Sequence, residues 1–211
     1  MQKKILIAAA LLFLSLWSLA QDDVTRSQLA SKYYFNKEYG KAVELYKKLY
    51  EENYSKVYFD RYLKCLKELE QYNKAEKLAR QQISRSSQDL TYYVDLGLVY
   101  EARNNYEKAE ETYNKAIDKI QPSRNMIVNL GNAFLSNGRY EYAEKLYNKA
   151  SKMLPDFSFH FQLASVYMMQ RKYEEMIGEY LDLLEKDPNR KGAIQNRMQY
   201  ITDNETTSDI H

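Results

Sequence analysis

Apolar residues recur along most of this chain at the spacing of one face of an α-helix. One stretch carries Ile127, Leu130, Gly131 and Phe134. Their i, i+3, i+4, i+7 spacing is typical of an amphipathic helix. Asn137 and Gly138 follow, and both residues tolerate the left-handed backbone that ends a helix. A second amphipathic stretch then begins, so the pattern predicts two helices joined by a short turn.

The same pattern returns at an interval of 33 or 34 residues. The prolines Pro122, Pro155 and Pro188 mark this interval, and so do the alanines Ala42, Ala75, Ala109 and Ala143. A fixed period of this length indicates a repeat architecture, in which each helix pair buries its apolar face against the next. The predicted repeats are residues 23–55, 56–88, 89–122, 123–155 and 156–189.

The repeated positions resemble the tetratricopeptide-repeat family, whose pattern is a large residue, Leu-Gly, Tyr, Ala, an aromatic residue and Pro at fixed offsets. Residues 123–155 carry it as Ile127, Leu130-Gly131, Phe134, Ala143, Tyr147 and Pro155. The resemblance covers about residues 23–188. It implies an all-α, right-handed α-solenoid of about five helix-turn-helix repeats plus a C-terminal capping helix.

Repeat two departs from this pattern. Leu63 stands where the other repeats have a small residue, and Ala79 stands where they have an aromatic one. Repeat five has Met176 in place of alanine. We therefore expect repeat two to be the weakest junction of the array.

The last predicted helix is a cap. Ile194, Met198 and Ile201 share one helical face, and polar residues cover the others. The solenoid with its cap is predicted to occupy residues 21–201, with the cap at 190–201. Residues 202–211 form a polar tail that we expect to fray.

Residues 1–20 are predicted to be a signal peptide. Lys3 and Lys4 precede the apolar run from Ile5 to Trp17, and Ser18-Leu19-Ala20 supplies small residues for cleavage after Ala20. The expected location is the cell envelope or the periplasm, with no membrane span after cleavage. The alternative is an uncleaved N-terminal anchor.

Charge and composition exclude several classes of function. The formal net charge is +2, and removal of Lys3 and Lys4 with the leader makes it zero. A neutral chain lacks the excess of basic residues that binds nucleic acid. The 21 tyrosines largely follow the repeat, which favours packing between helices with each hydroxyl reaching a partner or water. A stacking platform for bases or sugars is the alternative interpretation.

Catalytic chemistry has few candidates. The residues that most often bind metals or act as bases are limited to His160, His211 and Cys65. They form no metal-ligand cluster, no Gly-rich phosphate loop is present, and no Ser or Cys nucleophile has a histidine base. We therefore expect no enzyme activity, no cofactor and no metal, and we interpret Cys65 as a small packing residue.

The remaining candidate site is the inner face of the first helices, which in the tetratricopeptide family lines a concave groove for partner peptides. On this face lie Asn125, Asn129, Asn132, Ser136, Phe161, Gln162, Ser165, Met168 and Met169. Amides pair with a peptide backbone, and Phe and Met add apolar contact. Ser27 and Ser31 stand where the carboxylate clamp of chaperone-binding relatives has Lys and Asn, so the clamp is not reproduced.

The sequence therefore predicts a non-enzymatic protein–protein interaction scaffold that holds a peptide or helix of a partner. Other interpretations stay open. The face could be solvated and bind nothing, the chain could be the repeat region of a larger envelope protein, or it could be an enzyme or a sugar-binding module.

Overall fold

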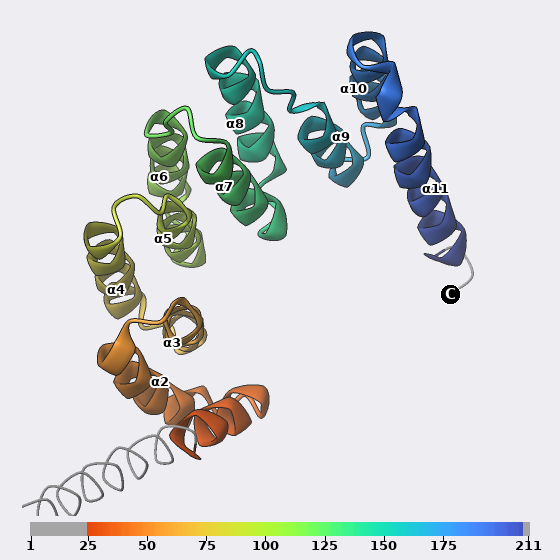
Figure 1. The fold of residues 1–211 in the computed structure, drawn as a ribbon. Coiled ribbons are helices and arrows are strands. Elements are labelled where there is room, and N and C mark those ends of the chain that lie inside the picture. Colours follow the sequence, from red (N-terminus) through yellow and green to blue (C-terminus); the bar gives the residue numbers. More distant parts are fainter. Residues whose placement is uncertain (1–24, 209–211) are drawn as a thin grey trace, which may run out of the picture. The chain divides into compact units, whose positions relative to one another are not determined.

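The computed structural model describes residues 25–208, which are helical apart from short connections and contain no strand. The order is helical residues 25–35, then α2 (Tyr39–Asn53), α3 (Lys56–Glu68), α4 (Tyr72–Arg85), α5 (Thr91–Ala102), α6 (Tyr106–Asp118), α7 (Arg124–Ser136), α8 (Tyr140–Met153), α9 (His160–Met169), α10 (Tyr173–Lys186), the 3₁₀ turn η1 (Pro188–Arg190) and α11 (Lys191–Ser208) (Figure 1). The predicted all-α fold of paired helices is confirmed.

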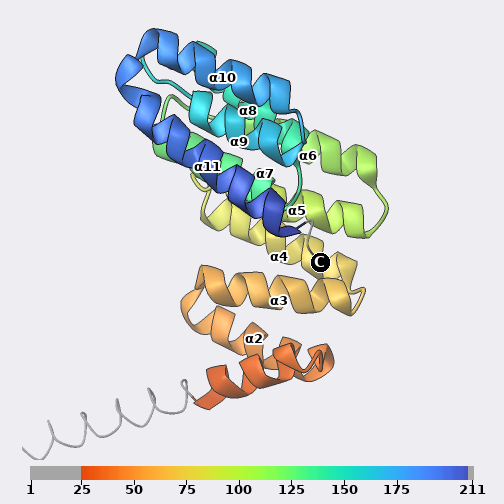
Figure 2. The same cartoon turned by 90° about the vertical axis from the view of Figure 1, so that its right-hand side faces the viewer.

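The described chain divides into two compact units. The first contains residues 25–87 and 95–109, and the second contains residues 88–94 and 110–208, so the division passes through α5 and α6. In the first unit the helices from residue 25 to α4 form two consecutive pairs. In the second unit α7 pairs with α8 and α9 pairs with α10, and α9, α10 and α11 lie side by side (Figure 2).

One backbone turn joins the two helices of every pair. In each turn one residue has a left-handed backbone, with φ between 57° and 69°: Lys37, Glu70, Asn104, Gly138 and Arg171. Two backbone hydrogen bonds surround it, as in Arg139 N–H to Phe134 O at 2.8 Å and Gly138 N–H to Leu135 O at 3.0 Å. This Schellman motif satisfies the last carbonyl groups of the first helix. The sequence predicted it only where glycine is present.

The helices meet through faces of mixed large and small residues. In the second unit Ile127, Leu130 and Phe134 of α7 are fully buried, as are Ala143 and Tyr147 of α8. Burial of such faces is the main source of stability, because folding of this chain is supported by no disulfide. The large and small positions exchange sides in repeat two, where Leu63 and Ala79 are both buried.

Polar contacts connect each repeat to the next one within both units. In the first unit the Tyr100 hydroxyl donates to Glu76 Oε1 at 2.8 Å. In the second unit Lys145 Nζ donates to Asn114 Oδ1 at 2.7 Å. These partners lie 24 and 31 residues apart and belong to consecutive repeats, so they help to set the register between neighbouring helix pairs.

The tyrosines were expected to pack between helices with each hydroxyl reaching a partner or water, and this expectation is wrong at three residues. Tyr106 and Tyr173 occupy repeating positions, yet 65% and 38% of their surface is exposed. Each is the first residue of its helix, so its ring stands at the end of the interface between helices, where water reaches it. The Tyr147 hydroxyl is buried without a hydrogen-bond partner among residues 25–208, because it lies against the backbone at Gly131.

The C-terminal helix is longer than predicted. It runs to Ser208 instead of ending at residue 201, because no proline or glycine follows Gly192 to stop it. The signal peptide at 1–20, its cleavage site and the tail residues 209–211 lie outside the described residues. Between residues 25 and 208, no helix combines the length and apolar character needed to span a membrane.

Candidate functional site

The solvent-exposed face of α7 carries a line of amide side chains. Ser123 caps the helix by accepting the Met126 backbone N–H, and the apolar stripe from Ile127 turns inward. Asn125, Asn129 and Asn132 therefore face solvent on the opposite side. Their amides have no hydrogen-bond partner within residues 25–208. Each free amide can donate and accept at the same time.

Ser136 continues this line by one further turn. Its side chain is exposed, and its Oγ donates to the Ala133 carbonyl at 3.2 Å, a local bond within the helix. The hydroxyl therefore uses its proton inside α7 and also accepts from Asn137 Nδ2 at 3.5 Å, so one lone pair remains for an outward contact. The structure thus places all four predicted α7 residues on one open face.

The predicted residues of α9 have a different environment. Phe161 and Met168 pack at the edge of a core cluster that includes Ile194 of α11, and Ile201 of the same helix packs against this cluster as well. The Arg197 guanidinium lies 4.5 Å from the centre of the Phe161 ring. Helix α11 therefore already contacts the side of α9 that was predicted to meet a partner.

The other three α9 residues differ in what they offer. Ser165 Oγ donates to the Phe161 carbonyl at 2.8 Å and lies 3.5 Å from the Arg197 guanidinium, so it belongs to the contact with α11. Met169 is exposed. The Gln162 Oε1 atom is buried and has no partner among the described residues. Sequence reasoning did not identify Arg197 as the residue that covers Phe161; its place between Ile194 and Ile201 was the available signal.

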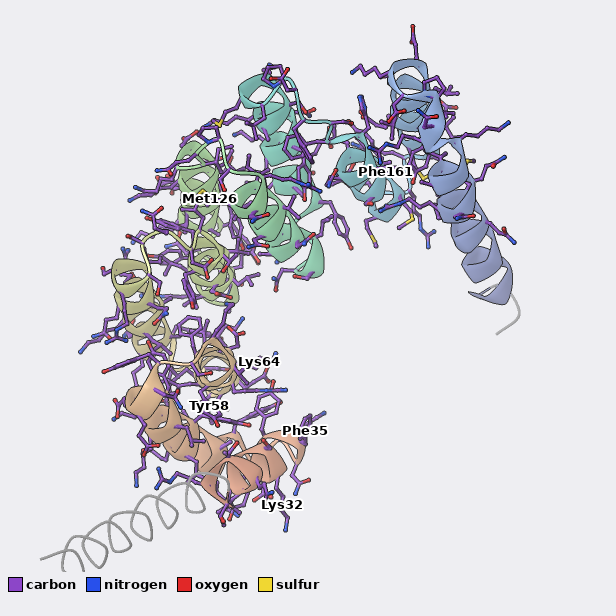
Figure 3. All side chains as sticks on the ribbon, in the orientation of Figure 1. Lys32, Phe35, Tyr58, Lys64, Met126 and Phe161 are labelled. Carbon is purple, nitrogen blue, oxygen red and sulfur yellow. The ribbon has the colours of Figure 1, made fainter. Side chains whose placement is uncertain are left out.

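First helices of the first unit present an aromatic and basic surface. Phe35 is 70% exposed, and the Arg61 guanidinium lies 4.3 Å and 5.3 Å from the ring centres of Tyr34 and Phe35. Phe35 and Lys64 lie on the same side of this unit (Figure 3). Lys64 forms an ion pair with Glu68 one turn later. This surface is therefore more strongly charged than the amide face of α7.

His160 has structural partners instead of catalytic ones. Lys186 Nζ donates to its Nε2 at 3.0 Å, so its Nδ1–H donates to Glu179 Oε2 at 2.7 Å. Both ring nitrogens thus tie α9 to α10. Among the described residues no group of three His, Cys, Asp or Glu side chains could hold a metal ion.

Cys65 lies fully buried in α3, and burial raises the pKa of its thiol to about 11. The thiolate form, which is the nucleophile, is therefore disfavoured at neutral pH. This environment agrees with the prediction that Cys65 is a packing residue.

A cavity of about 890 Å³ in the first unit was not predicted. Its walls come from α2, α3 and α4: Lys47, Tyr50, Glu51, Tyr54, Tyr62, Lys74, Lys77, Leu78, Arg80, Gln81, Ser84 and Arg85. The available signal was the spacing of Lys74, Lys77, Gln81 and Arg85, which places polar residues along one helical face.

Comparisons with known proteins match part of the repeat array. Family models described as tetratricopeptide repeat match residues 90–118 and 128–191. These segments fall within the third repeat and across the fourth and fifth repeats predicted from the sequence. No curated protein matches the chain.

Solved structures that are similar to this chain share little sequence with it. A crystal structure of MamA protein is 17% identical, with 81% of this chain and 94% of that chain covered and a TM-score of 0.38. TTC0263, a thermophilic TPR protein of Thermus thermophilus, is 19% identical, with 85% and 97% covered and a TM-score of 0.41. The TPR2AB domain of yeast Sti1, solved as a pHSP90 complex, is 16% identical, with 81% and 79% covered and a TM-score of 0.41.

Proposed function

We propose that this protein, which belongs to the tetratricopeptide-repeat family, is a non-enzymatic scaffold that binds a peptide or helix of a partner protein. The binding surface is the solvent-exposed face of the first helices, with α7 as its principal contact. The single observation that carries this proposal is the line of exposed asparagines Asn125, Asn129 and Asn132, whose amides have no partner among residues 25–208.

Amide side chains suit a partner whose backbone is extended. Each asparagine offers a carbonyl oxygen and an NH₂ group, which match the alternating N–H and C=O groups of a peptide. The spacing of i, i+4 and i+7 places the three amides on consecutive turns, about 5.4 Å apart along the helix axis. Such bonds recognise the backbone, so side-chain specificity comes from neighbouring residues such as the exposed Met169.

Helix α11 limits how far a partner extends onto α9. Phe161, Ser165 and Met168 contact or border α11, which covers part of their surface, so less of them is open to a partner. Met169 is the exposed α9 residue that remains for a partner on α7, and Gln162 lies beside it with its Oε1 atom buried. The proposed surface therefore consists of Asn125, Asn129, Asn132 and Ser136 on α7 with these two α9 side chains beside it.

We also propose that the protein is exported and works in the cell envelope or periplasm, with its signal peptide cleaved after Ala20. The support is the order of basic, apolar and small residues in the leader. N-terminal sequencing of the protein from fractionated cells tests this. A chain that begins at Gln21 in the periplasmic fraction supports export, and an intact leader in the membrane fraction supports a retained anchor instead.

Capture of partners from envelope extract tests the scaffold. The Asn129→Ala plus Asn132→Ala double variant is compared with Asn148→Ala, which removes an exposed amide from α8. We expect the double variant to lose at least tenfold of the captured partner while its helical circular dichroism stays unchanged, and Asn148→Ala to capture as much as the wild type. Equal capture by all three proteins would exclude the α7 face as the principal contact.

A further inference from the structure

The cavity between α2 and α4 has an unbalanced charge. Its lining contains five cationic side chains, Lys47, Lys74, Lys77, Arg80 and Arg85, and a single carboxylate, Glu51. Its volume of about 890 Å³ falls in the range of roughly 300–1,000 Å³ that is typical of ligand sites. The composition of the whole chain does not explain this excess, because its 31 basic and 29 acidic residues nearly balance.

Only one of these cations is neutralised by a carboxylate within the part of the chain that the structure describes. Arg80 Nε lies 2.9 Å from Glu76 Oε1. Lys74 donates to the neutral amide oxygen of Gln71 at 2.8 Å. Lys47 and Lys77 have no ion-pair partner among residues 25–208. The cavity therefore presents a positive potential that an anion would neutralise.

Arg85 is held in position by aromatic side chains instead of a carboxylate. Its guanidinium lies 3.5 Å from the centre of the Tyr54 ring, and its Nη1 donates to the Tyr50 hydroxyl at 3.0 Å. The Tyr50 hydroxyl in turn donates to Gln82 Oε1 at 2.5 Å. A guanidinium that is fixed in this way loses little entropy when it binds an anion.

Tyr54 reaches this position through an unfavourable backbone. Its φ is 54°, in the left-handed region, which costs a non-glycine residue roughly 1–2 kcal/mol. Tyr54 and Ser55 form the whole connection between α2 and α3, so the strained residue also places its ring under Arg85.

The charges are spread along a line, which favours a peptide over a compact anion. Lys74, Lys77 and Arg85 lie on one face of α4, and the eleven steps from Lys74 to Arg85 give a length of about 16 Å at 1.5 Å per residue. A single phosphate group meets only one end of such a line. An extended segment of about five residues covers all of it, at roughly 3.3 Å per residue.

We propose that the α2–α4 cavity binds an acidic peptide segment of a partner protein. Carboxylates of the peptide pair with Lys47, Lys74 and Lys77, and the fixed Arg85 guanidinium binds a further carboxylate in a bidentate pair. This site belongs to the first unit, and it differs from the amide face of α7 in both position and chemistry.

Fluorescence anisotropy with a labelled, end-capped hexaglutamate peptide tests the proposal on the full 211-residue chain. The wild type binds hexaglutamate but not hexalysine, and binding weakens as salt rises. The Lys47→Gln plus Lys77→Gln variant weakens binding at least tenfold, and it leaves the Arg85–Tyr50–Gln82 network intact, so it retains the fold. Tyr54→Leu also weakens binding, although it changes no charge, because it removes the ring under Arg85.

The matched control is Lys48→Gln plus Lys115→Gln, which removes the same charge at exposed positions outside the cavity. It keeps wild-type affinity. Equal weakening by this control would overturn the proposal, since binding would then follow net charge alone. Pyrophosphate that competes with hexaglutamate at equal affinity would also overturn it, because the site would then be a compact anion site.

Discussion

The Gly131 backbone in α7 lies directly against the phenol ring of Tyr147 in α8. A Cβ atom at residue 131 would overlap the Tyr147 Oη and Cζ atoms and lie 3.0 Å from Cε2. Both residues are buried. The close approach of these two helices therefore depends on the missing side chain of Gly131, and it leaves the Tyr147 hydroxyl in an apolar setting.

Gly131→Ala is expected to destabilise the protein by about 1–3 kcal/mol, the usual cost of overpacking a core. Tyr147→Phe removes the atom that the new methyl group meets first, so the double variant recovers part of this loss. Urea unfolding followed by circular dichroism measures all three free energies. A Gly131→Ala protein as stable as the wild type would show that α7 and α8 separate without cost.

Tyr147 also predicts how stability depends on alkaline pH. Burial raises the pKa of Tyr147 from 10.0 to about 12. Between these values the unfolded chain releases the phenol proton while the folded chain keeps it, so the free energy of unfolding falls as pH rises through this window. The Tyr147 contribution is fully present below pH 10.

The comparison with Tyr147→Phe isolates this residue, because burial raises the pKa of other tyrosines such as Tyr46 and Tyr180 as well. Between about pH 9 and pH 12 the free energy of unfolding of the wild type is expected to fall by about 1–2 kcal/mol more than that of Tyr147→Phe. Parallel stability curves of the two proteins would contradict this.

The left-handed turn residues predict that glycine stabilises two of the turns. Glu70 and Arg171 have φ of 57° and 59°. Replacing either residue by glycine removes the steric cost of this backbone, and the net gain is about 0.5–1 kcal/mol after the larger entropy of glycine in the unfolded chain. Gly138→Ala is expected to lower the stability by a similar amount, because alanine has to adopt the left-handed backbone of Gly138. Thermal unfolding measures each change, and a loss of stability in Glu70→Gly would refute the explanation.

The small residues of α4 predict local opening in repeat two. Helix α4 buries Ala75 and Ala79, whereas α6 buries Tyr113 and Ile117 at its core. Less buried apolar area gives a smaller free energy of local opening. Amide hydrogen exchange is expected to be faster in residues 72–85 than in 106–119, and slower exchange in 72–85 would reverse the assignment of the weakest junction.

Cys65 is expected to react slowly with a thiol reagent at about pH 8. The side chain is fully buried, and the pKa of its thiol is raised to about 11 by burial. Reaction therefore requires opening of the surrounding helices, so its rate rises steeply in urea near the unfolding midpoint. Immediate labelling in native buffer would show that the thiol is accessible.

Local patterns explain why most of the fold could be predicted. The face that a helix buries depends on residues three and four apart. The spacing of Ile127, Leu130 and Phe134 therefore predicts this face from the local sequence alone. The repeat length of 33 or 34 residues then places each turn. For the same reason the exposed asparagines of α7 could be predicted, since they lie opposite this apolar stripe.

The sequence by itself thus determined the paired helices and the polar face of α7. Only the tertiary structure decided which side chains cover which faces, because those contacts join residues far apart along the chain. Arg197 covers Phe161 from 36 residues away, and Arg85 meets Tyr50 from 35 residues away. Contacts at such separations depend on how neighbouring helix pairs pack, and no local periodicity encodes that packing.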